Sequence, residues 1–263
     1  MKLKEQVAAA ELKLMLRSDQ ALKQQNTLSE DLNTLFTFDD EPGSISIWYL
    51  ETPAQDLRKK DWSVRFRQFD DGGGLELTFK KRYSEKDYKA MLESDIAKMF
   101  SAEFTPEIDI EYTNKTYSLS FERVFTDMED GLTEPEAKRL AILNSPQVFT
   151  DWEGKNTGFV HLCGATLLGP VVAATYKGSY EALEAKLEIW NIGSDLTELS
   201  FDVPTKKSTQ LKRDLLKILT EYNLLQTENQ LKTDAFLDYF GKKKQSGKSK
   251  QDNAKSSSNS SQA

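Results

Sequence analysis

Cysteine and histidine are almost absent from this chain of 263 residues, which has only Cys163 and His161. A single cysteine cannot form an intramolecular disulfide, and the two residues are too few for a zinc site of the Cys/His finger type. A run of about 18 apolar residues, the length that crosses a membrane, is also missing. Charges interrupt the first ten residues, where a signal peptide needs its apolar centre. We therefore expect a soluble, cytoplasmic protein in a reducing compartment.

An excess of positive charge is lacking as well. The chain has 35 Lys and Arg against 42 Asp and Glu, a net charge of −7, whereas proteins that coat nucleic acid carry a basic field. We expect no binding to a nucleic-acid duplex and no membrane partner, so any basic site must be local. Hydrophobic residues make up 38% of the chain and aromatic residues 10%, which is enough for a buried core. The oligomeric state stays open.

The C-terminal residues 241–263 contain no large apolar side chain. Such a segment cannot offset the entropy lost on ordering, so we expect a disordered Lys- and Ser-rich tail behind a folded domain over residues 1–240. Its lysines could act as a weak localisation or anion-binding signal, but a solvated tail is the simpler interpretation.

Segments with alternating or β-branched apolar residues are frequent before that tail, and they predict nine strands. The predicted strands cover residues 8–17, 45–50, 62–69, 75–82, 116–125, 159–163, 171–177, 182–190 and 197–203. Cap signals predict four helices. These begin near Ser84, Thr133, Ser208 and Thr227, and the last ends at Gly241. A further helix is expected over residues 19–35.

Several of the predicted strands carry charges on one face only. Residues two apart in a strand point to the same side, so Arg65 and Arg67 share one face while Val64 and Phe66 share the other. The same alternation occurs with Glu11 and Lys13, with Glu76, Thr78 and Lys80, and with Glu184, Lys186 and Glu188.

Two structures explain this alternation. In the first, the sheet is half exposed, with apolar side chains inside and charged ones in water. In the second, the sheet closes into a barrel wrapped by helices, so that the apolar faces pack outward and the charges converge inside. In such an interior, Arg and Lys would bind phosphoryl oxygens, and carboxylates would hold a divalent metal that bridges to the same phosphates. The alternation alone does not choose between them.

Residues 49–82 read YLETPAQDLRKKDWSVRFRQFDDGGGLELTFKKR. This run resembles the pattern of the CYTH or triphosphate-tunnel family, in which a Tyr-x-Asp-Thr-Pro turn precedes a Leu, an Arg-x-Arg strand and a strand ending in Thr-x-Lys. Glu51 stands where Asp is usual. The positions that fit are Tyr49, Thr52, Pro53, Leu57, Arg65, Arg67, Thr78 and Lys80. The segment AAELKLMLRS looks like the family's Glu-x-Glu-x-Lys strand, with Glu11 as the second Glu and Lys13 as the Lys.

Two positions that are acidic in the family pattern are not acidic here. Ala9 stands at the place of the first Glu, where the family's paired carboxylates supply metal ligands. Ser200 fills the second position of a late Glu-x-Glu strand whose first position is Glu198. The candidates for replacing the lost carboxylates are Glu184 and Glu188, and those for extending the basic lining are Arg123 and Lys177.

The resemblance implies an α+β protein with a closed eight-stranded antiparallel β-barrel and surrounding helices. It also implies dependence on Mg²⁺ or Mn²⁺ and hydrolysis of a triphosphate compound: inorganic triphosphate, thiamine triphosphate, a nucleotide or an RNA 5′ end. The protein would position the phosphates and neutralise developing charge, with a metal-held water as nucleophile. The implied roles are catalysis for Glu11 and Lys13, phosphate binding for Lys13, Arg65, Arg67, Lys80, Arg123 and Lys177, and metal binding for Glu11, Glu188 and Glu198.

Three functions are therefore open. The first is a metal-dependent triphosphate hydrolase. The second is a degenerate tunnel that binds phosphate-rich anions without turnover, which the losses at Ala9 and Ser200 favour. The third is an interaction protein with a charged outer sheet. It would be excluded by convergence, inside one closed barrel, of Arg65, Arg67, Lys80 and Lys13.

Overall fold

The computed structural model describes residues 9–24, 27–126 and 131–241. Its strands are β1 (Ala9–Leu16), β2 (Thr37–Phe38), β3 (Gly43–Glu51), β4 (Trp62–Phe69), β5 (Leu75–Tyr83), β6 (Thr105–Ile110), β7 (Lys115–Phe125), β8 (Thr166–Tyr180), β9 (Leu183–Asn191) and β10 (Asp195–Pro204). Its helices are α1 (Ser18–Ala21), α2 (Glu30–Leu35), α3 (Asp56–Lys59), α4 (Glu85–Leu92), α5 (Ile96–Glu103), α6 (Glu134–Leu143), α7 (Gln147–Thr150), α8 (Thr157–Gly164) and α9 (Thr205–Glu221). A further helical segment covers residues 232–241.

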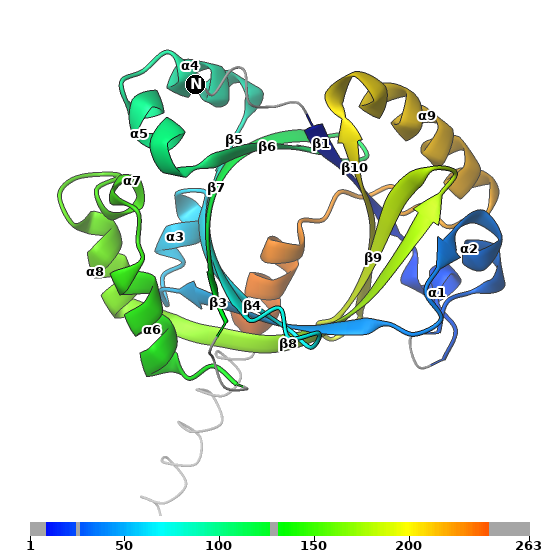
Figure 1. The fold of residues 1–263 in the computed structure, drawn as a ribbon, viewed down its shortest axis with the longest axis horizontal. Coiled ribbons are helices and arrows are strands. Elements are labelled where there is room, and N and C mark those ends of the chain that lie inside the picture. Colours follow the sequence, from blue (N-terminus) through cyan, green and yellow to red (C-terminus); the bar gives the residue numbers. More distant parts are fainter. Residues whose placement is uncertain (1–8, 25–26, 127–130, 242–263) are drawn as a thin grey trace, which may run out of the picture.

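Nine strands of the described chain close into a barrel, and helices surround it (Figure 1). The order around the ring is β8-β3-β4-β5-β7-β6-β1-β10-β9, and β9 pairs back with β8. The short β2 pairs with β8 without joining the ring. Neighbours in the ring are antiparallel except β1 and β6, which are parallel. A ring of strands that alternate in direction throughout needs an even number, so a ring of nine must contain a parallel pair. The predicted closed barrel is confirmed, but the prediction of eight strands, all antiparallel, is wrong.

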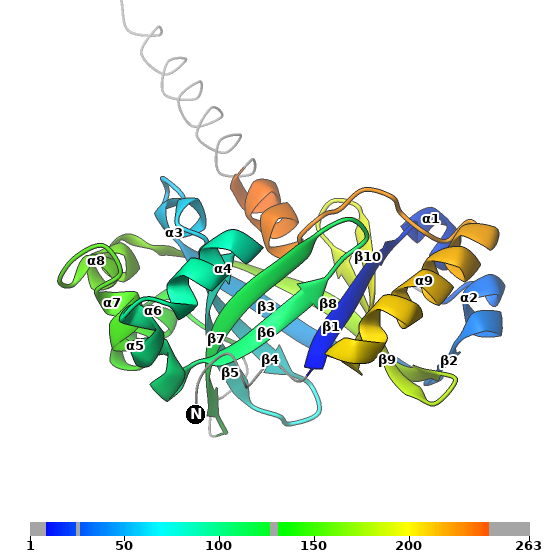
Figure 2. The same cartoon turned by 90° about the horizontal axis from the view of Figure 1, so that it is seen from above.

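The apolar faces of the strands point outward, against the helices. On one side, Val64 and Phe66 of β4 belong to a core that includes Phe149 of α7 and residues of α4, α5, α6 and α8. On the other side, Leu12 of β1 packs in a second core with Leu215 of α9. Figure 2 shows these two groups of helices at opposite ends of the molecule. The charged residues that alternate with these apolar ones are thereby directed to the interior.

A third core lies within the barrel and uses the helical segment 232–241. Phe236 is fully buried there and packs on Tyr49 of β3 and Trp190 of β9, with ring centroids 4.7 and 6.4 Å apart. Figure 1 shows this segment, in orange, seen through the ring of strands. The interior is therefore part apolar and part charged, and the C-terminal segment fills the apolar part.

Most predicted elements are found at nearly the predicted positions. The short elements β2, α3 and α7 were not predicted, and the last predicted helix begins at residue 232 rather than near Thr227. Three further differences are larger. Residues 159–163 lie in α8 rather than in a strand, because periodicity cannot distinguish a short apolar run in a strand from one in a buried helix. Gly158 allows this helix to approach α7, since a Cβ there would lie 2.1 Å from the Phe149 carbonyl oxygen. The helix predicted over residues 19–35 is divided into α1 and α2, and β6 was not predicted.

The predicted disordered tail falls outside the described residues except for Gly241. None of the described helices is both long and apolar enough to span a membrane.

Candidate functional site

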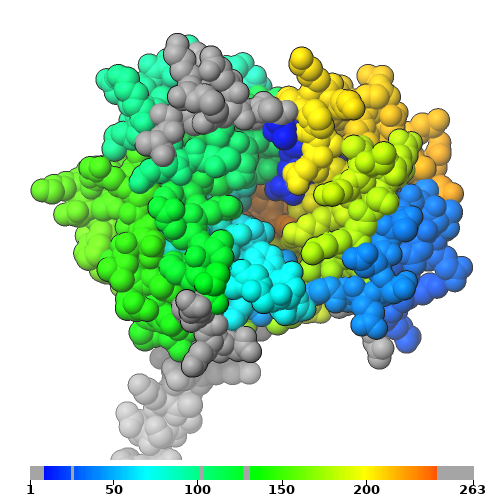
Figure 3. Space-filling view, in the orientation of Figure 1, coloured from blue at the N-terminus to red at the C-terminus, as the bar shows by residue number. Residues whose placement is uncertain are grey.

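A cavity of about 260 Å³ lies inside the barrel. Figure 3 shows its mouth at the centre of the molecule, with the orange C-terminal segment behind it. Both signs of charge line it. The cationic side chains are Lys13, Arg65, Arg67, Lys80, Arg82, Lys186 and Lys232, and the carboxylates are Glu11, Glu107, Asp109, Glu111, Glu122, Glu188, Glu198 and Glu228.

Most of the residues selected from the sequence meet in this cavity. Those that line it are Glu11, Lys13, Arg65, Arg67, Lys80, Glu188 and Glu198. Because their charges converge inside a closed barrel, the alternative of an ordinary sheet with its charged face in water is excluded.

Three of the selected residues do not line the cavity. Arg123 follows Glu122 in β7, and because neighbours in a strand alternate it lies on the outer face, with its guanidinium 4.6 Å from the ring centroid of Phe121. Lys177 is exposed and pairs in register with Lys186, and Glu184 is also exposed. We therefore leave these three residues out of the site.

The basic wall of the cavity is formed by β4 and β5. Arg67 donates two hydrogen bonds of 2.9 Å to the carboxylate of Glu76. Arg65 is less well satisfied: its Nη2 lies 3.4 Å from Thr78 Oγ1 and 3.5 Å from Glu76 Oε1, and its buried Nε has no hydrogen-bond partner within the described residues. Burial, and secondly the charge of Arg65, lower the pKa of Arg67. Two crowded guanidiniums share one carboxylate, so this wall favours a further anion.

The unpredicted strand β6 supplies carboxylates that pair with the selected lysines. Asp109 Oδ1 lies 3.0 Å from Lys13 Nζ, and Asp109 Oδ2 lies 3.6 Å from Lys80 Nζ. Lys80 is also 2.6 Å from Glu107 Oε2, and Lys13 is 2.9 Å from Glu11 Oε2. Burial raises the pKa of Asp109, but the two ammonium groups outweigh it and lower the pKa to about 2. In the sequence, the signal for this strand was the acidic residue at every second position of TPEIDIE.

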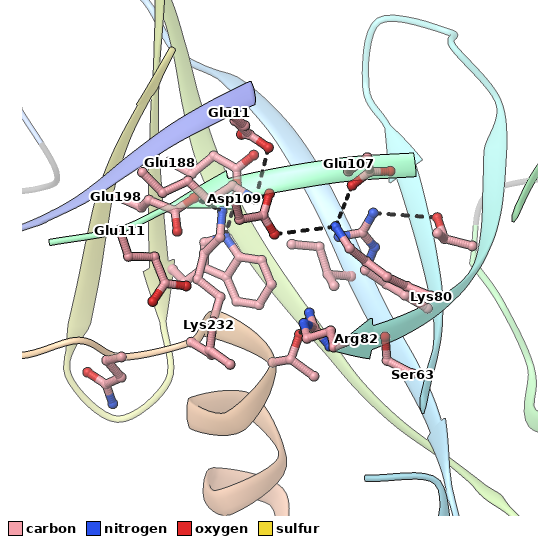
Figure 4. A pocket seen from close by; sticks show the side chains of 18 of the residues that line it. Glu11, Ser63, Lys80, Arg82, Glu107, Asp109, Glu111, Glu188, Glu198 and Lys232 are labelled. Atoms are coloured by element: carbon pink, nitrogen blue, oxygen red, sulfur yellow. Dashed lines mark hydrogen bonds and ion pairs between the residues drawn. The ribbon is translucent and has the colours of Figure 1, made fainter. Parts of the chain in front are cut away.

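The acidic wall of the cavity is formed by β9 and β10, where Glu188 and Glu198 face each other in register. Between them lies the ammonium group of Lys232, 2.5 Å from Glu188 Oε2 and 2.6 Å from Glu198 Oε1 (Figure 4). Lys186 pairs with Oε1 of Glu188, and Trp190 Nε1 donates a 3.0 Å hydrogen bond to Oε2. Burial raises the pKa of Glu188, but the two lysines outweigh it and the pKa lies well below its usual range. No sequence pattern identified Lys232, because only the closed fold brings it here.

The carboxylates predicted to hold a metal do not form one donor set. In the β1–β10 ladder, Glu11 faces Asp202, whereas Glu198 faces Met15 four residues further along β1. Four residues of strand span about 13 Å between Cα atoms, so the two carboxylates project from well-separated positions of the ladder. Within the described residues there is no group of three or more His, Cys, Asp or Glu side chains arranged to hold a metal. The predicted Mg²⁺ or Mn²⁺ site therefore does not fit this arrangement.

The chain is similar to known proteins in both sequence and fold. The model of the family described as "CYTH domain" matches residues 9–144, just over half of the chain. Among solved structures, one similar fold is that of a putative adenylyl cyclase from Hippeastrum, which is described as having a dominant triphosphatase activity. The two sequences are 16% identical, and the TM-score is 0.57. The match covers 87% of this chain and 94% of the Hippeastrum chain. No curated protein matches the chain.

Two further similar structures are putative adenylate cyclases. The one from Bacillus halodurans is 12% identical, with a TM-score of 0.48, and the match covers 88% of this chain and 99% of that one. The one from Vibrio parahaemolyticus is also 12% identical, with a TM-score of 0.43 and coverage of 86% and 97%. At such identities a structural likeness speaks for the fold alone.

Proposed function

The chain belongs to the CYTH domain family, and on that premise we propose that its barrel binds a triphosphate or similar phosphate-rich anion on the wall formed by Arg65, Arg67 and Lys80. The ligand class is the one expected from the sequence. The proposed site has fewer basic residues than the predicted one, because it omits Arg123 and Lys177.

The observation that carries this proposal is that the hydrogen-bond donors of Arg65 are poorly satisfied. Among the described residues its buried Nε has no hydrogen-bond partner, and its Nη2 makes only long contacts. A buried donor without an acceptor costs roughly 1–3 kcal/mol, and more when it is charged. A phosphoryl oxygen near Arg65 would supply the missing acceptor and separate the charges of Arg65 and Arg67.

The other features of the cavity fit a compact polyanion. Its volume of about 260 Å³ lies just below the roughly 300–1,000 Å³ of ordinary small-molecule pockets. Arginine binds phosphate through paired N–H groups, and lysine adds a point charge. Lys80 and Lys13 already share Asp109, so a phosphate chain along β5 and β6 would compete with that carboxylate for both ammonium groups.

Hydrolysis of the bound anion is a second candidate, favoured by Glu122. This carboxylate lines the cavity in the same row as Arg65, since Thr78 faces Glu122 on one side and Arg65 on the other. Partial desolvation, followed by the charges of Glu76 and Glu107, raises the pKa of Glu122, and a carboxylate with a raised pKa is a stronger base.

In that reaction, a water oxygen would attack the terminal phosphorus while its proton passes to Glu122. The bond from that phosphorus to the bridging oxygen would break, and inorganic phosphate and the shortened phosphate chain would leave. The guanidinium of Arg65 and the ammonium of Lys80 would stabilise the charge that develops on the phosphoryl oxygens. No step is assigned to a metal, because the carboxylates do not fit one.

Calorimetric titration with inorganic triphosphate, ATP and thiamine triphosphate tests the binding proposal. The variants are Arg65→Gln and, as a matched control, Arg123→Gln on the outer face of the barrel. We expect Arg65→Gln to weaken binding of at least one ligand about tenfold or more, since a charged hydrogen bond contributes roughly 1.5–3 kcal/mol. Arg123→Gln should bind as the wild type does. Equal affinities for all three proteins would contradict the proposal.

Release of phosphate from the same compounds tests the second candidate, with Mg²⁺, with Mn²⁺ and with EDTA. Turnover by the wild type that is lost in Glu122→Gln supports hydrolysis. Binding without turnover under all three conditions would leave the anion-binding function alone.

A further inference from the structure

The ammonium group of Lys232 occupies the centre of the acidic wall. It contacts one oxygen of Glu188 and one of Glu198, and it lies 5.2 Å from the ring centroid of Trp190. The second oxygen of Glu188 is paired with Lys186. Two carboxylates that face each other across neighbouring strands repel unless a cation lies between them. Here the cation is a side chain of the protein itself.

Lys232 is held in this position by its neighbours in the chain. Thr233 Oγ1 accepts a 3.1 Å hydrogen bond from Arg82 Nη2 and lies 3.1 Å from the Tyr49 hydroxyl. Asp234 forms a 2.9 Å ion pair with Arg58 of α3. Together with the buried Phe236, these contacts fix the start of the segment 232–241 at the barrel interior. The ammonium is therefore positioned by the fold, unlike the end of a freely moving surface lysine.

We propose that Lys232 is the built-in cation of this barrel: its ammonium takes the place between Glu188 and Glu198 that a divalent metal would otherwise occupy, and the barrel binds its anion without a metal. A divalent metal of this kind needs carboxylate oxygens as ligands. In this arrangement, three of the four oxygens of the two carboxylates already contact an ammonium group. The first half of the proposal, that Lys232 takes the place of a divalent metal, does not depend on the proposed function. The second half, that the anion binds without a metal, rests on the proposed function.

The first test measures Mn²⁺ binding without any phosphate compound, by the loss of the free-Mn²⁺ electron paramagnetic resonance signal. The full-length variants are Lys232→Met, which keeps the aliphatic stem over Trp190, and Lys232→Arg, which keeps the charge. Lys217→Met on the exposed face of α9 is the matched control for a lost lysine. We expect Lys232→Met to bind Mn²⁺ about tenfold or more tightly than the other proteins, because the uncompensated carboxylates then need a cation. The double variant Lys232→Met/Glu198→Gln should lose this gain in Mn²⁺ affinity.

Two results of this test would overturn the proposal. One is wild-type protein that binds Mn²⁺ as tightly as Lys232→Met. The other is a Lys232→Met protein that gains no affinity although its circular dichroism spectrum and cooperative melting show it to be folded.

The second test uses the wild type alone, so it remains decisive if Lys232→Met does not fold. Inorganic triphosphate is titrated in EDTA and again in Mn²⁺, and we expect dissociation constants within about threefold of each other. Binding that requires Mn²⁺ would overturn the inference and leave the proposed function standing. Absence of triphosphate binding under both conditions would refute the proposed function and the second half of the inference, while the Mn²⁺ comparison would still decide the first half.

Discussion

Arg67 donates two parallel hydrogen bonds to Glu76, the residue that faces it across the β4–β5 ladder. Arg65, two residues earlier on the same face, reaches the same carboxylate only at 3.5 Å. One carboxylate thus neutralises one guanidinium well and the other poorly. On the wall formed by Arg65, Arg67 and Lys80, Arg65 therefore has the less satisfied guanidinium.

The first prediction concerns Glu76. We expect Glu76→Ala to lower the free energy of unfolding by about 3 kcal/mol, because removing one partner of a buried ion pair leaves the other charge uncompensated. Inorganic triphosphate should restore part of this loss by supplying a new anion. Urea unfolding with and without triphosphate measures both effects, and Glu85→Ala, in an exposed pair with Lys89, is the control that should change neither. A variant as stable as the wild type would show that Arg67 does not depend on Glu76.

The second prediction concerns acid stability and Asp109. The pKa of this carboxyl is lowered from 3.8 to about 2 in the folded protein. The ionised form is therefore favoured by folding, and its contribution of about 2 kcal/mol is complete above the unfolded pKa and lost as the pH falls from about 4 to about 2. Urea unfolding across this range should show a shallower pH dependence for Asp109→Asn than for the wild type. Identical slopes would contradict the paired state of Asp109.

The charged interior could be predicted from the sequence where the evidence is local. The alternation of Arg65 and Arg67 with Val64 and Phe66 fixes which side chains share a face, whatever the strand pairs with. The closure of the sheet, by contrast, was inferred from the resemblance of residues 49–82 to a family. Alternation alone is equally compatible with an open sheet, so the wrapping helices had to be seen before the charged face could be assigned to the inside.

The missed features depend on contacts between distant parts of the chain. β6 is short and begins with Thr105 and Pro106, and its parallel partner β1 lies almost a hundred residues earlier. The helix that carries Lys232 was predicted, but which residue it presents to Glu188 follows only from its docking in the barrel. For a related reason, the spacing of residues in the sequence does not show that the register of β1 with β10 separates Glu11 from Glu198.

The third prediction concerns the docking of the segment 232–241. Phe236 is fully buried against Tyr49 and Trp190, so Phe236→Ala should lower the free energy of unfolding by about 3–5 kcal/mol through loss of burial and creation of a cavity. Chemical denaturation measures the change. Tyr222, the residue that follows α9, is 37% exposed. Tyr222→Ala is therefore the control and should lower the free energy of unfolding much less. If both variants lowered the free energy of unfolding by the same small amount, the segment 232–241 would not fill the apolar part of the barrel.

The fourth prediction separates binding from turnover at Glu122. If the barrel hydrolyses its ligand, the raised pKa of this carboxyl means that the base is lost as the pH falls through that pKa, so kcat should decline on the acid side. Glu122→Gln should lower kcat by about 10²–10⁴-fold, the usual contribution of a general base, and flatten the acid limb. The affinity for triphosphate should stay the same or rise, because a carboxylate facing the anion is removed. Glu221→Gln on α9 is the matched control. An unchanged kcat would exclude Glu122 as the base, whereas a parallel loss of kcat and affinity would show that it positions the phosphate-binding residues instead.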